Sequence, residues 1–148
     1  MIVYADASAL VKRYVIETGS NEVIGLTSAA DVVATLLVTR TEVGAAFARA
    51  VRMNILDDAS GRRAQRMFAR EWQDLARVAV TEALVGRAEA LAWEFGLRGY
   101  DAVQLAAALA WRDSIGKEVV LATFDRQLWE AGAQVGFETW PKQFPGLR

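Results

Sequence analysis

The chain has 148 residues, contains neither cysteine nor histidine, and carries 17 basic against 18 acidic side chains. This length predicts one domain over residues 1–148. The missing residue types exclude disulfides, thiolate metal sites, a Ser-His-Asp triad and a ribonuclease that uses imidazole as acid and base. Any enzymatic chemistry must therefore use carboxylates, hydroxyls, arginines or a metal ion held by oxygen ligands. A net charge of -1 means that binding to a nucleic acid would depend on a local basic patch.

Short apolar runs alternate with segments in which apolar residues recur every three or four positions. In chain order, these patterns predict strand 2–5, helix 8–15, helix 20–29 with Ser20 as its N-cap, strand 31–37, helix 43–51, helix 60–76 with Met67 facing inward, strand 77–80, helix 86–95, helix 101–110, strand 119–122, helix 125–131 and strand 134–139. Strands without a polar face that alternate with helices predict an α/β fold. Its sheet is parallel and is covered by helices on both sides.

Four acidic residues fall where these elements begin or end. Asp6 follows the first strand, Asp125 follows the fourth, and Glu42 and Asp101 lie at the starts of helices. Sites in an open parallel sheet form at the carboxyl ends of its strands, so we expect the four acids to meet at one edge. Taken singly, an acid at the start of a helix is more often an N-cap or a partner of the helix dipole, and that alternative applies to each of them.

Two hydroxyl side chains accompany these acids. Ser8 follows Asp6 by two residues, and Thr123 precedes Asp125 by two. Carboxylates gathered in a partly dry pocket repel each other, and a divalent cation removes that difficulty. Oxygen ligands without histidine or cysteine favour Mg²⁺ or Mn²⁺ over Zn²⁺.

The acids and hydroxyls lie in four short segments: Asp6 with Ser8, Thr41-Glu42-Val43, Leu97-Arg98-Gly99-Tyr100-Asp101-Ala102 and Thr123-Phe124-Asp125. Their order and spacing resemble the PIN domain, and among PIN domains the VapC type, the toxin of bacterial VapBC toxin–antitoxin pairs. The resemblance implies a three-layer α/β/α sandwich with a five-stranded parallel sheet. It also implies that the catalytic and metal-binding acids are Asp6, Glu42, Asp101 and Asp125, supported by Ser8 and Thr123.

The function that the resemblance implies is that of an endoribonuclease dependent on Mg²⁺ or Mn²⁺. Such an enzyme hydrolyses RNA with metal-activated water and is paired with a VapB-like antitoxin; we also expect a homodimer. The same chemistry would cut DNA, so a structure-specific DNA nuclease of this fold is an alternative. A second alternative is a non-catalytic module that binds RNA or protein.

Arginine is the prevailing basic residue, and its planar guanidinium suits phosphate. The candidates for contact with RNA are Arg40, Arg62, Arg66 and Arg70. The alternative for those on the 60–76 helix is an ordinary solvated helix face. No basic segment precedes the apolar run 2–5, and no apolar stretch approaches the ~20 residues of a membrane span. We therefore expect a cytoplasmic protein without a membrane association.

Overall fold

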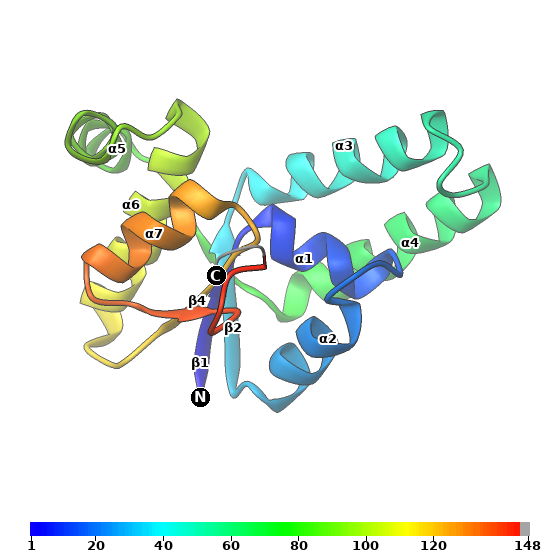
Figure 1. The fold of residues 1–148 in the computed structure, drawn as a ribbon, viewed down its shortest axis with the longest axis horizontal. Helices are drawn as coiled ribbons and strands as arrows, with labels where there is room; N and C mark the ends of the chain where they lie inside the picture. Colours follow the sequence, from blue (N-terminus) through cyan, green and yellow to red (C-terminus); the bar gives the residue numbers. More distant parts are fainter. Residues whose placement is uncertain (146–148) are drawn as a thin grey trace.

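Five strands and seven α-helices make up residues 1–145, the part of the chain that this computed structural model describes (Figure 1). The strands are β1 (Ile2–Ala5), β2 (Val32–Leu36), β3 (Ala76–Val78), β4 (Val120–Ala122) and β5 (Glu138–Trp140). The helices are α1 (Ala7–Tyr14), α2 (Ser20–Ala29), α3 (Thr39–Arg52), α4 (Asp58–Glu71), α5 (Glu82–Phe95), α6 (Gly99–Ile115) and α7 (Arg126–Gln134), and the 3-10 turn η1 (Trp72–Asp74) follows α4. Each predicted element is present.

The strands form a single parallel sheet in the order β3-β2-β1-β4-β5. From the central β1, the chain first adds β2 and β3 on one side and later adds β4 and β5 on the other. The order of the strands therefore reverses between β1 and β4, which pair directly through Tyr4 and Leu121. In sheets of this kind, the connections leave the two strands in opposite directions and open a crevice at their carboxyl ends. Asp6 and Thr123 come directly after these two strands.

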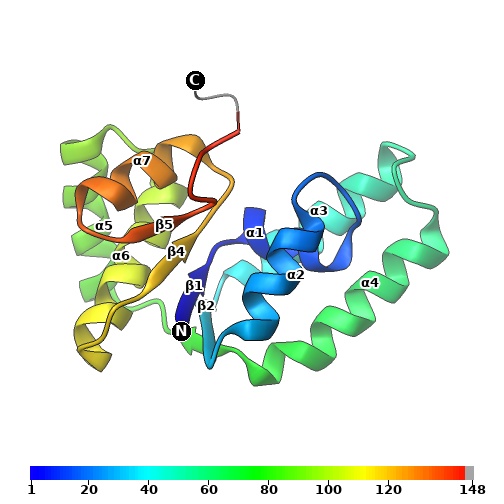
Figure 2. The same cartoon turned by 60° about the horizontal axis from the view of Figure 1, so that its bottom comes forward.

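Helices cover both faces of the sheet, as predicted. Figure 2 shows α1–α4 on one side of the sheet and α5–α7 on the other. Side chains alternate between the two layers because successive residues of a strand point to opposite faces. Val3 and Val120 pack in the α1–α4 layer, whereas Tyr4 and Leu121 pack in the α5–α7 layer. Since both faces are buried, the strands show no polar face in the sequence.

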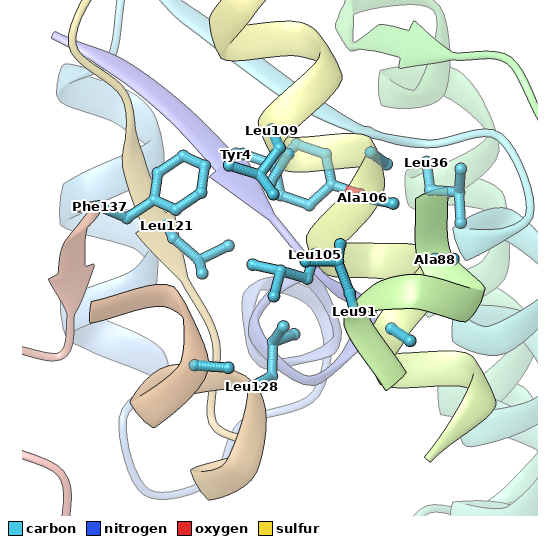
Figure 3. Close-up of a cluster of buried hydrophobic side chains, with 14 of the residues drawn as sticks. Tyr4, Leu36, Ala88, Leu91, Leu105, Ala106, Leu109, Leu121, Leu128 and Phe137 are labelled. Carbon is cyan, nitrogen blue, oxygen red and sulfur yellow. The ribbon is translucent and has the colours of Figure 1, made fainter. Parts of the chain in front are cut away.

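Helix α6 is the most deeply packed helix of the α5–α7 layer. It contacts α5, α7 and β2, and Ala106, Ala107 and Ala108 are fully buried. Figure 3 shows Leu105 and Leu109 of α6 among the side chains of the sheet and the neighbouring helices. This helix packs on more than one face, because its small alanines let neighbours approach on several sides. None of the helices within residues 1–145 is long and apolar enough to cross a membrane.

The predictions for Ser20 and Met67 are wrong. Gly19, with a φ of 92°, is the N-cap of α2, and Ser20 is the first helical residue. The Ser20 hydroxyl instead donates to the Val15 carbonyl and accepts from the Glu17 N–H, which closes the loop between α1 and α2. Met67 is 39% exposed, because α4 packs through Ala64 and Phe68 and the periodicity did not distinguish its flank from its buried stripe.

Several element ends also differ from the prediction. Helix α5 begins four residues earlier than expected, because the Thr81 side chain caps it by accepting from the Leu84 N–H. Helix α6 begins at Gly99, two residues before the predicted start. The break between α5 and α6 therefore contains one glycine with a positive φ, Gly96, which ends α5. Helix α7 continues to Gln134, and β5 is correspondingly shorter than the predicted strand.

Replacing Gly132 by alanine should destabilise the protein by ~1–3 kcal/mol, the usual cost of overpacking a core. A Cβ at this position of α7 would overlap Cδ2 of Leu121, which is fully buried in β4. The matched control is Gly86→Ala in α5, where nothing lies within 4 Å of an added Cβ. That variant should gain up to ~1 kcal/mol from helix propensity. Urea unfolding followed by circular dichroism measures both changes, and equal effects would contradict the close packing of α7 on β4.

Candidate active site

Asp6 is buried at the centre of the acidic edge, with 5% of its surface exposed. It is the N-cap of α1: its Oδ1 accepts from the Ala9 N–H at 3.0 Å and from the Ser8 hydroxyl at 2.7 Å. Its Oδ2 accepts from the Thr123 hydroxyl at 2.7 Å. The capping role is therefore real, and the same carboxylate is held between the ends of β1 and β4.

The two hydroxyls bind Asp6 to the loop between β4 and α7. The Ser8 oxygen accepts from the Phe124 N–H at 2.8 Å, and the Thr123 oxygen accepts from the Asp125 N–H at 3.0 Å. Each hydroxyl thus gives its only proton to Asp6 and uses a lone pair to bind the backbone of this loop. The position of Asp6 is consequently coupled to that of Asp125.

Glu42 lies in the first turn of α3 and is held by a buried glutamine. The Gln104 side-chain amide donates to Glu42 Oε1 at 2.9 Å and to the Thr39 hydroxyl at 3.0 Å, and its carbonyl oxygen accepts from the Tyr4 hydroxyl at 2.6 Å. This chain of contacts links β1, α6 and α3. Sequence reasoning missed Gln104, although it is the one polar residue in the apolar stretch 102–110 and follows Asp101 by almost one helical turn.

Asp101 and Asp125 share a basic partner. Asp101 lies in the first turn of α6, and Asp125 is the N-cap of α7, where its Oδ1 accepts from the Leu128 N–H at 3.0 Å. The Arg98 guanidinium donates through Nε to Asp101 Oδ2 at 3.2 Å and through Nη2 to Asp125 Oδ2 at 2.8 Å. Sequence reasoning missed this arginine as a site residue.

Burial raises the pKa of three of these carboxyl groups, and neighbouring negative charges add to the effect. Burial raises the pKa of Asp6 to about 6. The hydrogen bonds that Asp6 accepts lower this pKa, and the charge of Asp125 raises it further. Burial, together with the charges of Asp6 and Asp101, raises the pKa of Glu42 to about 7 although Gln104 donates to it. Burial and the charge of Asp125 also raise the pKa of Asp101, against the effect of Arg98. The structure thus brings all four acids into one mutually repelling group.

This donor set suits a hard divalent cation. Carboxylate oxygens without nitrogen or sulfur ligands are what Mg²⁺ and Mn²⁺ prefer, and a cation would compensate both the burial of these negative charges and their repulsion. As the side chains stand, no three acidic groups within residues 1–145 are placed to hold one metal ion together. One reason is visible in the contacts: Asp101 and Asp125 both direct Oδ2 to Arg98.

The predicted RNA-binding arginines are not gathered at the acidic edge. Arg40 lies two residues before Glu42 in the first turn of α3, with its guanidinium 5.8 Å from the centre of the Trp72 ring. Arg62 pairs with Asp58, the first residue of α4. Figure 1 shows α3 running away from the sheet to its hairpin with α4, which carries the exposed Arg66 and Arg70. Contact with RNA stays a prediction for all four, and only Arg40 belongs to an element that starts at the acids.

Comparison with known proteins finds no matching family model. Two curated proteins of Mycobacterium tuberculosis, ribonuclease VapC45 and ribonuclease VapC49, are each 35% identical to the chain over 142 residues, which is 96% of the chain and 96% of each relative.

Solved structures share the fold at low sequence identity. A toxin–antitoxin complex from Klebsiella pneumoniae contains a chain with 16% identity and a TM-score of 0.65, and the match covers 97% of this chain and 98% of that one. FitAcB from Neisseria gonorrhoeae matches with 13% identity and a TM-score of 0.60, over 93% of this chain and 96% of that one. At these identities the likeness supports the fold alone.

Proposed function

The chain belongs to the VapC family of PIN-domain ribonucleases, and on this basis we propose that it is a metal-dependent endoribonuclease and the toxin of a toxin–antitoxin pair. The observation that carries the proposal is the group of four carboxylates around the carboxyl ends of β1 and β4. Both curated relatives are named ribonucleases, and the structural neighbour from Klebsiella pneumoniae comes from a toxin–antitoxin complex. An inert binding module has no use for four acids that repel each other at a strand switch point.

The residues that would hold the metal are Asp6, Asp101, Asp125 and Glu42. A bound Mg²⁺ or Mn²⁺ supplies water activation near neutral pH and neutralises charge on the scissile phosphate, which is what a site without histidine needs. The 2′-hydroxyl of RNA is not required as nucleophile, so the expected products carry a 5′-phosphate and a 3′-hydroxyl.

The surrounding residues orient these acids. Ser8 and Thr123 donate to opposite oxygens of Asp6, so its carboxylate plane is fixed. Gln104 donates to Oε1 of Glu42, and within residues 1–145 no hydrogen bond occupies Oε2. Such support keeps ligands within the narrow geometric limits that catalysis requires.

The partners follow from the same site. RNA approaches an acidic pocket only if basic groups hold its backbone, and Arg40 at the start of α3 is the best placed of the candidates.

For the antitoxin, charge complementarity favours an arginine or lysine side chain that reaches Asp6 or Asp101 and blocks the site. This proposal places the protein in the cytoplasm, with its RNA substrate and its antitoxin, and includes the expected homodimer.

Incubation of the purified chain with single-stranded RNA in Mg²⁺ or Mn²⁺, and then in EDTA, tests the proposal. We expect cleavage with either metal and none in EDTA, and little cleavage of single- or double-stranded DNA. Equal activity in EDTA would eliminate the metal mechanism, preferential cutting of DNA would favour the DNA nuclease, and binding without cutting would favour the non-catalytic module. Growth arrest on expression of the chain, relieved by the product of the adjacent gene, tests the pairing with an antitoxin.

A further inference from the structure

Arg98 is the one basic residue within residues 1–145 that forms an ion pair with any of the four acids. Its guanidinium bridges Oδ2 of Asp101 and Oδ2 of Asp125, which belong to the beginnings of α6 and α7. The two oxygens converge on one cationic group from two separate helices. A single positive charge therefore already joins the third and fourth acids.

The position of this guanidinium is unusual for an arginine. It lies at the starts of two helices, where the positive ends of the helix dipoles disfavour a cation. The Arg98 side chain is 73% exposed, whereas those of Asp101 and Asp125 are only 13% and 23% exposed. Arg98 thus lies on the solvent side of the two carboxylates, and its ion pairs with them compensate the unfavourable helix dipoles.

We propose that Arg98 is a tethered counter-ion, which takes the place of a metal cation between Asp101 and Asp125 in the metal-free protein and must move away before a divalent ion binds there. The inference rests on the proposed function, because it concerns the metal that this function requires. It assigns to Arg98 a positioning role: the residue neutralises the acidic site when no metal is present and lowers the affinity of the site for metal.

The arrangement allows Arg98 to leave at little cost. Its ion pairs are exposed on the arginine side, and such pairs contribute little to stability. Asp125 keeps its hydrogen bond from the Leu128 N–H through Oδ1, so its side chain stays in place when Oδ2 is released. A divalent ion brings two charges to the site where Arg98 brings one, and therefore displaces the guanidinium once its concentration is sufficient.

Titration calorimetry with Mn²⁺ alone tests this role in the full chain. Arg98→Ala should bind Mn²⁺ about three- to tenfold more tightly than the wild type, since the loss of one or two exposed ion pairs is worth a factor of this order. The matched control is Arg87→Ala, which removes the same charge and an exposed ion pair to Asp113 near the other end of α6. Its affinity for Mn²⁺ should equal that of the wild type.

Thermal unfolding gives a second measurement that does not depend on activity. In EDTA, Arg98→Ala should melt below the wild type because Asp101 and Asp125 then repel each other without compensation. Saturating Mn²⁺ should raise its Tm by more than it raises that of the wild type. Arg98→Gln, which keeps a polar side chain at this position, should show the same two effects and serves as the second variant if Arg98→Ala does not fold.

Equal or weaker binding of Mn²⁺ by Arg98→Ala or Arg98→Gln would overturn the inference. If the wild type nevertheless cuts RNA only with metal, the proposed function stands and Arg98 simply orients Asp101. If the wild type neither binds Mn²⁺ nor cuts RNA, the inference and the proposed function fail together.

Discussion

Asp101→Asn should lower the rate of RNA cleavage by at least about a thousandfold, which corresponds to ~4 kcal/mol of transition-state stabilisation. The substitution keeps the size and shape of the side chain, and its amide oxygen still accepts from Arg98. It removes the negative charge that would hold the metal at the start of α6. The rate of cleavage of a single-stranded RNA in saturating Mg²⁺ or Mn²⁺, measured for wild type and variant, provides the test.

The matched control for this substitution is Asp113→Asn. Asp113 lies on the same helix, is exposed, and pairs with Arg87 rather than with the acidic group. It loses the same charge, so its cleavage rate should stay within about twofold of the wild type, as is usual for surface changes away from a site. Full activity of Asp101→Asn, with an unchanged circular dichroism spectrum, would remove Asp101 from the proposed mechanism.

The metal-free protein should lose stability as the pH rises from about 4 to about 7. Asp6 and Glu42 have pKa values raised from 3.8 to about 6 and from 4.5 to about 7, respectively. In this window the native state binds more protons than the unfolded state, so the free energy of unfolding falls with increasing pH. Below about pH 4 both groups are protonated in the native state and their repulsion is absent.

Asp6→Asn isolates this effect from the titration of other groups. The variant should not carry a buried charge at this position, and among the other acids it should lower the raised pKa of Glu42, which loses the neighbouring charge of Asp6. In EDTA at pH 8 it should be more stable than the wild type by no more than about 3 kcal/mol, the shift of the Asp6 pKa expressed as free energy. At pH 4 that advantage should be largely lost.

Urea unfolding in EDTA at pH 4, 6 and 8 measures the difference between Asp6→Asn and the wild type. Asp113→Asn serves as the control for the change in net charge. Added Mn²⁺ should reverse the order at pH 8, because only the wild type gains the full binding energy of the metal. A difference that does not change between pH 4 and pH 8 would show that Asp6 is not destabilised by its charge in the native state.

The positions of the acids illustrate what local patterns predict well. Asp6 and Asp125 follow short apolar strands, and in a parallel sheet the carboxyl ends of all strands lie on one edge. Once the strands are predicted, the residues that directly follow them are therefore expected at this edge of the sheet. The alternative of an N-cap also holds for these two acids, because one carboxylate has enough oxygens to cap a helix and to face the site.

Contacts that cross the fold were not predictable in this way. Gln104 binds Glu42 and Tyr4, which are 62 and 100 residues away in the chain, and Arg98 binds Asp125 from 27 residues away. No periodicity connects such partners, since it reports only which face of one element is buried. Arg62 and Arg70 looked equivalent to Arg40 in the sequence, but they lie on α4, the second helix of the hairpin, whereas Arg40 lies in the first turn of α3 together with Glu42 (Figure 1).

The sequence by itself determined the fold class, the order of the elements and the kind of chemistry open to the chain. The first two follow from hydrophobic periodicity, which is a property of each element by itself, and the third follows from the composition of the whole chain. Neither requires knowledge of contacts between distant residues. The tertiary structure alone decided which side chain pairs with each acid and which element ends differ from the pattern. It did so because hydrogen bonds and ion pairs form between atoms that only the packed sheet and helices bring within about 3 Å of each other.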